Sequence, residues 1–293
     1  MRNKLLLTIV IIELILLVLI NPKSTNKNSY DYSINIYKES NLDQAKLENY
    51  IIGVVAAEMP ATFSIESLKA QAVAARTFTY KKIINNQLNY NNLSTDKGQA
   101  YYNLDQLKKN WGNKYDEYYD KIANAVLSTK GEVITYNGEL INAYYFSISN
   151  GKTEDSKEVF GEASYLVSVE SPWDKNYSSY NNKVKINLDE FKNKLNIKND
   201  VTINEIKRTT SNHVDYIIIN NQKYDGVKFR KLLDLRSTDF EIDIDEKYAT
   251  ITTKGHGHAV GMSQYGANSM AKDGKTYKDI IRYYYQGVKI EKI

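Results

Sequence analysis

Apolar residues recur at helical spacing along two consecutive segments that follow residue 40. The first segment repeats with a period close to four, at Leu42, Ala45, Tyr50, Val54 and Ala57. Pro60 is expected to end this helix, because proline lacks the N–H group that a helix interior needs. Ser64 then occupies the capping position of a second helix. Glu66 lies in the first turn of this second helix, where the helix dipole favours an anion. The second helix is alanine-rich and apolar around most of its circumference, which predicts burial on several sides.

The rest of the chain alternates short strands with short helices. Residues 85–112 are polar and are predicted to form a loop, and 118–131 a helix that Gly131 ends. Asn137-Gly138 favours a tight turn, so a hairpin is expected over 131–149. The pattern further predicts a strand and helix in 184–197, a hairpin in 215–229, a helix in 229–237, a strand in 247–254, and helices from about Met262 and Tyr277. Strands and helices mix without regular βαβ order, which indicates the α+β class.

The composition of the sequence changes between residues 184 and 253, where polar residues dominate. We interpret this part as a β-rich inserted subdomain within a core formed by residues 41–183 and 254–293. Residues 23–40 are expected to contain a polar linker followed by a first strand, since 32–38 alternate between apolar and polar positions.

The N-terminus has the pattern of a membrane-targeting segment. Arg2 and Lys4 precede an apolar run over 5–20 that is slightly short for a spanning helix of about 20 residues. The run also resembles the core of a signal peptide, but no small-x-small cleavage site follows it. We favour an uncleaved signal anchor over residues 1–22, with a cleaved signal peptide as the alternative. Either one places the body of the protein outside the cytoplasm, and the anchor predicts a single-pass protein of the plasma membrane.

Composition narrows the classes of function. The chain has 293 residues, of which 42% are hydrophobic and 25% charged, as in ordinary globular proteins. A net charge of +4 is too small to indicate a nucleic-acid partner. The absence of cysteine excludes disulfides, thiol nucleophiles and cysteine-ligated zinc.

The segment KGHGHAVGMSQYGA admits three interpretations. His256 and His258 suggest a metal, but two histidines without a third ligand make a weak metal site. The glycines suggest a purely structural loop with tight turns. A polar recognition loop is the third: His258, Ser263 and Gln264 supply hydrogen bonds to a hydroxylated ligand, and Tyr265 a stacking face. A serine-hydrolase site is disfavoured, because GMSQYG does not match the nucleophile-elbow pattern.

Glu58 is the best candidate acid, because apolar neighbours raise the pKa of a carboxyl group, as a general acid near neutral pH requires. An ordinary exposed helix end is the structural alternative. Arg76 is a second charge within an apolar helix. It either pairs with Glu58, which would lower the pKa of that acid, or binds substrate.

Three long motifs in order resemble the stage II sporulation protein D family: GVVAAEMPATFSIESLKAQAVAARTFTY, AYYFSISNGKTEDSKEVFG and GHAVGMSQYGANSMAKDGKTYKDIIRYYYQGVKI. The resemblance places the catalytic glutamate on Glu58 and puts Arg76 in the same cleft. It carries Ser147, Ser149, His258, Ser263 and Gln264 over as substrate-binding positions. Phe146 stands where the family has histidine, so zinc bound by some relatives near this segment is not expected, and no cofactor is predicted.

The resemblance implies a membrane-anchored lytic transglycosylase that cuts peptide-stripped peptidoglycan glycan strands during engulfment. One carboxylate then acts as acid and base, whereas ordinary glycosidases use two. The resemblance also implies two partners, a septal cell-wall amidase and a multi-spanning membrane anchor protein. The alternative function is a non-catalytic, peptidoglycan-binding activator of an amidase, since the same domain occurs in amidase enhancers.

Overall fold

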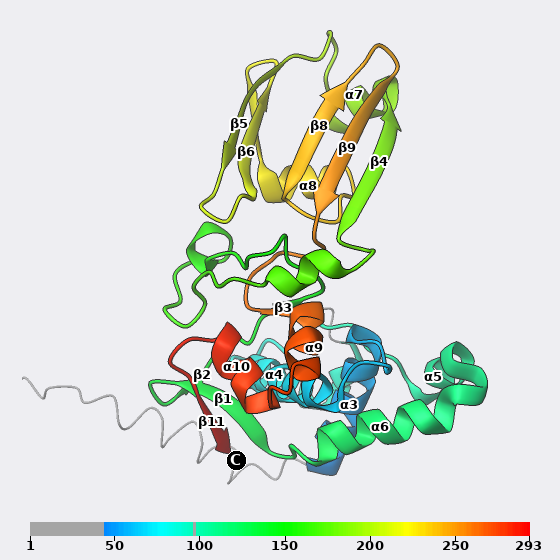
Figure 1. Cartoon of the computed structure of the whole chain (residues 1–293), viewed down its shortest axis with the longest axis vertical. Helices are drawn as coiled ribbons and strands as arrows, with labels where there is room; N and C mark the ends of the chain where they lie inside the picture. The colour runs from blue at the N-terminus through cyan, green and yellow to red at the C-terminus, as the bar shows by residue number, and fades with distance from the viewer. Residues whose placement is uncertain (1–43, 96–97) are drawn as a thin grey trace, which may run out of the picture. The chain divides into compact units, whose positions relative to one another are not determined.

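The computed structural model describes residues 44–95 and 98–293 of the chain. The predicted signal anchor over 1–22 and the linker and first strand over 23–40 lie outside these residues. In the part described, none of the helices has the length and apolar character needed to cross a membrane. Helices are mixed with several small sheets (Figure 1), so the predicted α+β class is confirmed.

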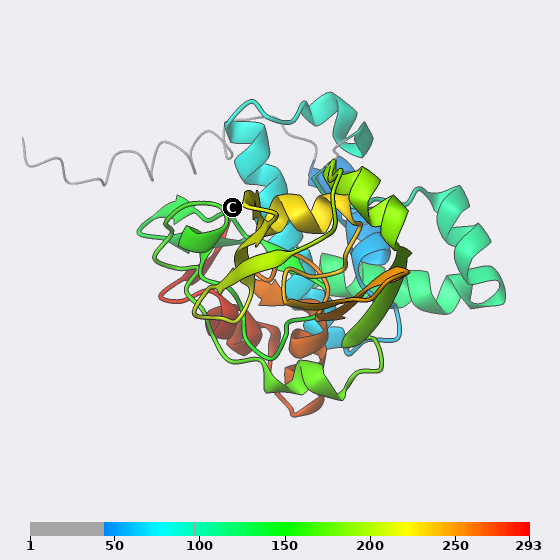
Figure 2. The ribbon, with the colours of Figure 1, turned by 90° about the horizontal axis from the view of Figure 1, so that it is seen from above.

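Two helices form the centre of the fold, α3 (Gln44–Glu58) and α4 (Ile65–Ile84), on either side of Pro60 as expected. The alanine-rich α4 is buried along most of its length, which confirms the prediction. It packs against the following elements, as Figures 1 and 2 show: α3, α6 (Tyr115–Leu127), α9 (Gln264–Lys272), α10 (Tyr277–Tyr284) and β1 (Glu132–Tyr136). Ser64 precedes α4, but its side chain makes no capping bond; its N–H donates to Asn268 Oδ1 at 2.9 Å instead.

The prediction of a loop over 85–112 was wrong for much of this range. The structure has short helices there: η1 (Tyr90–Thr95), α5 (Leu104–Trp111) and, next to them, η2 (Gly112–Lys114). Helix α5 begins with a capping box, in which the Asn103 and Gln106 side chains each accept the other's backbone N–H. Leu104, Leu107 and Trp111 recur at helical spacing, which the prediction overlooked in this short, mostly polar segment, and only Leu107 is buried.

The predicted hairpin at Asn137-Gly138 is confirmed, although its second arm is short. Strand β1 pairs with β2 (Glu139–Leu140) through a turn with φ of 50° at Asn137 and 86° at Gly138. These positive φ angles are those of the tight turn that asparagine and glycine favour. On its other edge β1 pairs with β11 (Lys289–Lys292).

A second, parallel pairing joins β3 (Tyr145–Phe146) to β10 (Met262–Ser263). It brings the FSISNG segment beside the start of α9. Together with β1 and helices α4, α9 and α10, these strands enclose the main hydrophobic core. Short turns η3 (Ser156–Glu158) and η4 (Pro172–Asn176) connect β3 to the next strands.

The strands of the predicted insertion have a hydrophobic core of their own. One sheet has the order β4-β9-β8 and the other β5-β6-β7. Their bounds are β4 (Asn181–Asn187), β5 (Ile203–Arg208), β6 (Val214–Ile219), β7 (Gln222–Asp225), β8 (Phe240–Ile244) and β9 (Tyr248–Lys254). Helices α7 (Leu188–Leu195) and α8 (Gly226–Leu232) accompany them. The predicted strands, hairpin and helices of this region are confirmed, with α8 starting three residues early; the limits 184–253 of a separate subdomain stay a prediction.

Candidate active site at the end of helix α3

Glu58 is the last residue of α3, at the point where Pro60 prevents the helix from continuing. Its side chain is half-buried and held by two uncharged donors. The backbone N–H of Ala100 donates to Oε1 at 2.7 Å, and Gln264 Nε2 makes a long hydrogen bond of 3.4 Å to Oε2. The carboxyl group therefore lies between two segments that are distant in sequence, residues 98–102 and the start of α9.

Residues 98–102 are fixed against α3 and α4, which positions the Ala100 N–H. Tyr102 N–H donates to the carbonyl of Gly53 at 3.2 Å. Gly53 permits this approach, because a Cβ atom there would lie 2.4 Å from the Tyr101 ring. The buried Gln99 side chain donates to Thr79 Oγ1 at 2.9 Å and accepts from the Tyr145 hydroxyl at 2.8 Å.

Gln264 is placed by the cap of α9. Ser263 Oγ accepts the N–H of Gly266 and donates to Asp174 Oδ2 at 2.8 Å. Asp174 is fully buried, and the same oxygen also accepts from the Ser149 N–H, the Ser149 hydroxyl and the Ser171 hydroxyl. This buried cluster holds α9 against the FSISNG segment, so Gln264 has a fixed position beside Glu58.

Burial raises the pKa of Glu58 above its ordinary value. The hydrogen bonds from Ala100 and Gln264 oppose this change, since they favour the charged form, but burial is the larger effect. Burial also raises the pKa of Asp174, where it again outweighs the hydrogen bonds that favour the charged form. Glu58 differs from Asp174 in being partly exposed, so it can exchange a proton with a ligand.

Arg76 does not line this site, which corrects the prediction that it contacts substrate or pairs with Glu58. Its side chain is 0% exposed and forms a two-pronged ion pair with Glu48, at 2.9 Å from Nε and 2.6 Å from Nη2. The carbonyls of Val126 and Glu132 accept two further N–H groups of the guanidinium. The guanidinium therefore makes its hydrogen bonds within the core, and it does not lower the pKa of Glu58.

Ser149 and Ser263 also differ from the prediction that they bind substrate. Both are 0% exposed, and their hydroxyls serve the Asp174 cluster. Ser147 is half-buried and takes part through its backbone, where its carbonyl accepts from the Tyr265 N–H at 3.1 Å. These serines hold the start of α9 and the FSISNG segment in place through hydrogen bonds. The resemblance alone did not distinguish this role from contact with substrate.

Tyr265 is half-buried, with its ring edge-on to Phe63 at 4.9 Å and to Tyr177 at 4.6 Å. It packs against the turn that follows Glu58 and lies next to Gln264 in sequence. Of the predicted site residues, Glu58, Gln264 and Tyr265 are thus brought together at one place.

His258 lies at a separate small pocket of about 200 Å³, lined mainly by the aromatic rings of Phe78, Tyr144, Tyr145 and Phe160. Burial lowers its pKa to about 4, with a smaller contribution from Arg230, so the ring is neutral at physiological pH. Gly98 also lines this pocket, so the segment that donates to Glu58 through Ala100 borders the pocket of His258 as well. Within residues 44–95 and 98–293, no group of three His, Cys, Asp or Glu side chains is placed to hold a metal ion.

Two contributors to the site were missed from the sequence. Ala100 acts through its backbone N–H, and because every residue except proline has this group, the residue type does not predict the role. Ala100 also lies in the range predicted to be a loop. Asp174 lies in SPWDKN, outside any motif that we singled out, and only its burial among hydroxyl donors reveals its role. An acidic residue beside proline and tryptophan was the one available signal.

Fold and site together define an α+β protein with a half-buried acid at a helix end, held by neutral donors. A family model described as Stage II sporulation protein matches residues 37–136. The chain is 44% identical over 273 residues to Stage II sporulation protein D of Bacillus subtilis (strain 168), covering 88% of this chain and 78% of that protein. It is 44% identical over 269 residues to the Bacillus amyloliquefaciens protein of the same name, with the same coverage.

A more distant relative is the Amidase enhancer of Bacillus subtilis (strain 168), at 27% identity over 293 residues, covering 80% of this chain and 39% of that protein. The chain belongs to the stage II sporulation protein D family, as the resemblance of its three motifs predicted.

Proposed function

We propose that this chain is a lytic transglycosylase that cleaves the β-1,4 bond between N-acetylmuramic acid and N-acetylglucosamine in peptide-stripped peptidoglycan. The observation that carries the proposal is the environment of Glu58. Its pKa is raised by burial, its two hydrogen-bond donors are uncharged, and Arg76 pairs with Glu48 instead. A carboxyl group in this setting stays protonated to higher pH than an exposed one, as a general acid requires.

The chemistry needs one group that first gives and then takes a proton. The Glu58 carboxyl donates its proton to the glycosidic oxygen as the bond from that oxygen to the anomeric carbon of the muramic residue breaks. The C6 hydroxyl of the same residue then forms a bond to that carbon, and its proton passes to the Glu58 carboxylate. The products are a free 4-hydroxyl on the leaving sugar and a 1,6-anhydro end, and no water is consumed. The Ala100 N–H and Gln264 amide stabilise the carboxylate that exists between the two steps.

The test is digestion of purified, peptide-stripped glycan strands by the full chain, with the products analysed by mass spectrometry. Anhydro-muramic ends are expected from the wild type and none from Glu58→Gln. Reducing ends, or full activity of the variant, would contradict the mechanism. Because Glu58 must be protonated to start the reaction, kcat/KM is expected to fall as the pH rises through its raised pKa.

Family membership supports a role in sporulation. We place the chain in the plasma membrane, held by residues 1–22 with the catalytic part outside the cytoplasm, and acting during engulfment. By family resemblance, its partners are a septal amidase, which strips the strands first, and a multi-spanning anchor protein. Membrane fractionation of the full chain and of a variant lacking residues 1–22 tests the anchor: only the full chain should sediment with membranes.

The second candidate function is activation of an amidase without catalysis by this chain. Similarity to an amidase enhancer favours it. The two functions separate on Glu58→Gln, because an activator should stimulate the amidase undiminished by this change and should cut no glycan alone. Stimulation lost together with glycan cleavage would favour the transglycosylase.

A further inference from the structure

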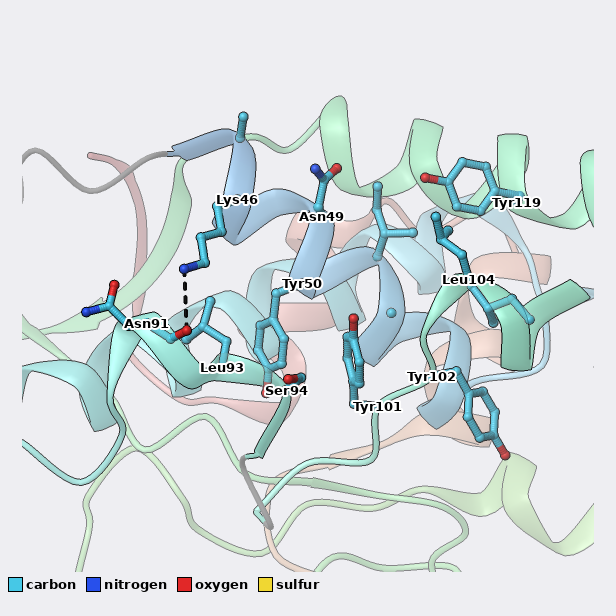
Figure 3. Close-up of a pocket in the computed structure, with 14 residues that line it drawn as sticks. Lys46, Asn49, Tyr50, Asn91, Leu93, Ser94, Tyr101, Tyr102, Leu104 and Tyr119 are labelled. Atoms are coloured by element: carbon cyan, nitrogen blue, oxygen red, sulfur yellow. Dashed lines mark hydrogen bonds between the residues drawn. The ribbon is translucent and has the colours of Figure 1, made fainter.

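A second, larger pocket lies along α3, about 560 Å³ in volume, between α3, η1, α5 and α6 (Figure 3). Four tyrosines and two asparagines are among the residues that line it: Tyr50, Tyr101, Tyr102, Tyr119, Asn49 and Asn91. Among the described residues that line it there is one lysine, Lys46, and none is Asp or Glu. The resulting surface combines flat apolar rings with neutral hydrogen-bonding groups and a positive charge, and it accommodates a ligand that is apolar on its faces and polar at its edges.

The pocket is connected to the candidate active site through residues 100–102. Ala100 donates to Glu58, the Tyr101 ring stacks on Tyr50 at 5.3 Å, and Tyr102 donates to the carbonyl of Gly53. The segment therefore runs back along α3 from the acid to the pocket wall. Asn49 and Glu58 are nine residues apart on this helix, about 13 Å along its axis and about two and a half turns around it, so their side chains leave α3 on opposite sides. A glycan strand that reaches both must therefore follow residues 100–102 around the helix.

Aromatic rings continue from the pocket along α6. Tyr119 lines the pocket and stacks on Tyr115 at 5.5 Å, and Trp111 follows at 6.3 Å from Tyr115. Tyr115 and Tyr119 are four residues apart on α6, which places them on one face, whereas Trp111 is the last residue of α5 and lies near Tyr115 across η2; all three are partly exposed. A row of partly exposed rings suits successive sugar rings of a polymer better than a single small molecule.

We propose that this pocket, defined by Asn49, Tyr101 and Tyr119, is a distal subsite for sugars of the same glycan strand that Glu58 cuts. The proposal rests on the proposed function for the identity of the strand. Removal of a stem peptide by an amidase leaves a carboxylate on each muramic lactyl group, so stripped strands are anionic. Lys46 and the lack of lining acids among the described residues complement this charge.

The test fills the pocket with a bulky side chain at an exposed helix position. Asn49→Trp does this, and Asn124→Trp is the matched control, since Asn124 is exposed on α6 and does not line the pocket. Cleavage by the full chain is measured on long stripped strands and on a tetrasaccharide of the same sugars. For Asn49→Trp the ratio of kcat/KM on long strands to that on the tetrasaccharide should fall about tenfold, the effect of losing about 1.4 kcal/mol of binding. For Asn124→Trp it should equal the wild-type ratio.

A binding measurement separates this proposal from the proposed function. Fluorescently labelled strands are titrated against the full-length Glu58→Gln protein with and without Asn49→Trp, and the Kd should rise about tenfold with the tryptophan. If the wild type cuts neither substrate, the transglycosylase assignment fails, but this Kd still judges the subsite. An unchanged Kd, or an equal change with Asn124→Trp, overturns the subsite.

Tyr119→Ser is the second variant, because it enlarges the pocket and does not fill it. It removes a half-buried ring and should also lower the long-to-short ratio and weaken binding of long strands. If Asn49→Trp does not fold, as judged by circular dichroism, Tyr119→Ser decides: wild-type ratio and Kd in that variant overturn the proposal.

Discussion

At the scale of single residues, Glu58 and Arg76 show how burial acts differently on a lone charge and on a paired one. Glu58 has only neutral donors, so burial raises its pKa and the carboxylate at neutral pH is destabilised. Arg76 is more deeply buried, but Glu48 and two carbonyls satisfy its guanidinium. The first arrangement leaves a reactive group at the surface, and the second gives a structural one in the core.

We expect Glu58→Gln to increase the stability of the protein at pH 7. A carboxyl group whose pKa is raised on folding binds its proton more tightly in the folded state, so its contribution is fully present below the unfolded pKa and is lost as the pH rises through the folded pKa. Glutamine keeps an acceptor for the Ala100 N–H and carries no charge. Thermal unfolding at several pH values should show the gain at pH 7 and no gain below about pH 4, near the pKa of an exposed glutamate. A variant less stable than the wild type at pH 7 would contradict the burial argument.

We expect loss of Arg76 to destabilise the fold strongly, because Glu48 is only 3% exposed and would be left as an unpaired buried charge. Arg76→Ala should cost about 3–5 kcal/mol in the free energy of unfolding, measured by urea denaturation. The double variant Arg76→Met, Glu48→Leu should lose less than Arg76→Ala, since no charge remains buried. Lys114→Ala, which breaks an exposed pair with Glu117, is the control and should change stability little.

At the scale of elements, short caps and buried polar clusters decide where the site residues lie. Helix α9 carries Gln264 in its first turn, and its cap residue Ser263 is bonded to the buried Asp174. Helix α10 begins at an exposed capping box made by Thr276 and Asp279. The two helices therefore offer a comparison between a cap that is embedded in the core and one that faces solvent.

We expect Ser263→Ala to cost about 3 kcal/mol, from the lost cap and from the donor withdrawn from buried Asp174. Thr276→Ala should cost about 1 kcal/mol, because its cap is exposed to water, which replaces the lost bond. Chemical denaturation of both variants measures the difference. Equal losses would show that the Asp174 cluster adds nothing to the cap.

The sequence predicted elements well where apolar periodicity was strong, as in α3, α4 and the Asn137-Gly138 hairpin. It failed for α5, where Leu104, Leu107 and Trp111 have helical spacing but the helix has only eight residues and lies in a mostly polar stretch. In the candidate site, Gln264 lies beside Glu58, and both residues belong to motifs at the ends of predicted helices; their role in the site stays a prediction. The partner of Arg76 was missed, since Glu48 lies on the neighbouring helix and only packing shows that the two side chains meet. Ala100 and Asp174 were missed because a backbone N–H and a buried hydroxyl cluster have no sequence pattern.

At the scale of the whole molecule, the strands of the predicted insertion are joined to the main core by a polar contact at Asn150. Asp239, at 2% exposed, accepts from Asn150 Nδ2 at 2.8 Å and from Arg208 Nη1 at 3.2 Å. Asn150 belongs to the FSISNG segment, and Asp239 and Arg208 to the inserted strands and the loop between them. Asn150 also donates to the carbonyl of Ser211. The segment that supports α9 is thus bonded directly to the insertion.

We expect Asn150 and Asp239 to be energetically coupled, which a double-mutant cycle measures directly. Asn150→Ala, Asp239→Ala and the double variant should show a coupling of about 1 kcal/mol in the free energy of unfolding, since each single change leaves the other partner half-buried or buried without this bond. Lys254, at the end of β9, and Glu241 on β8 form an exposed pair and serve as the control cycle, with no measurable coupling expected. If Asn150 and Asp239 prove additive, their hydrogen bond does not contribute to joining the two parts, and other contacts, such as that of Thr209 with Glu154, do so instead. Coupling would instead mean that these strands stabilise the FSISNG segment, which carries Ser149 of the Asp174 cluster.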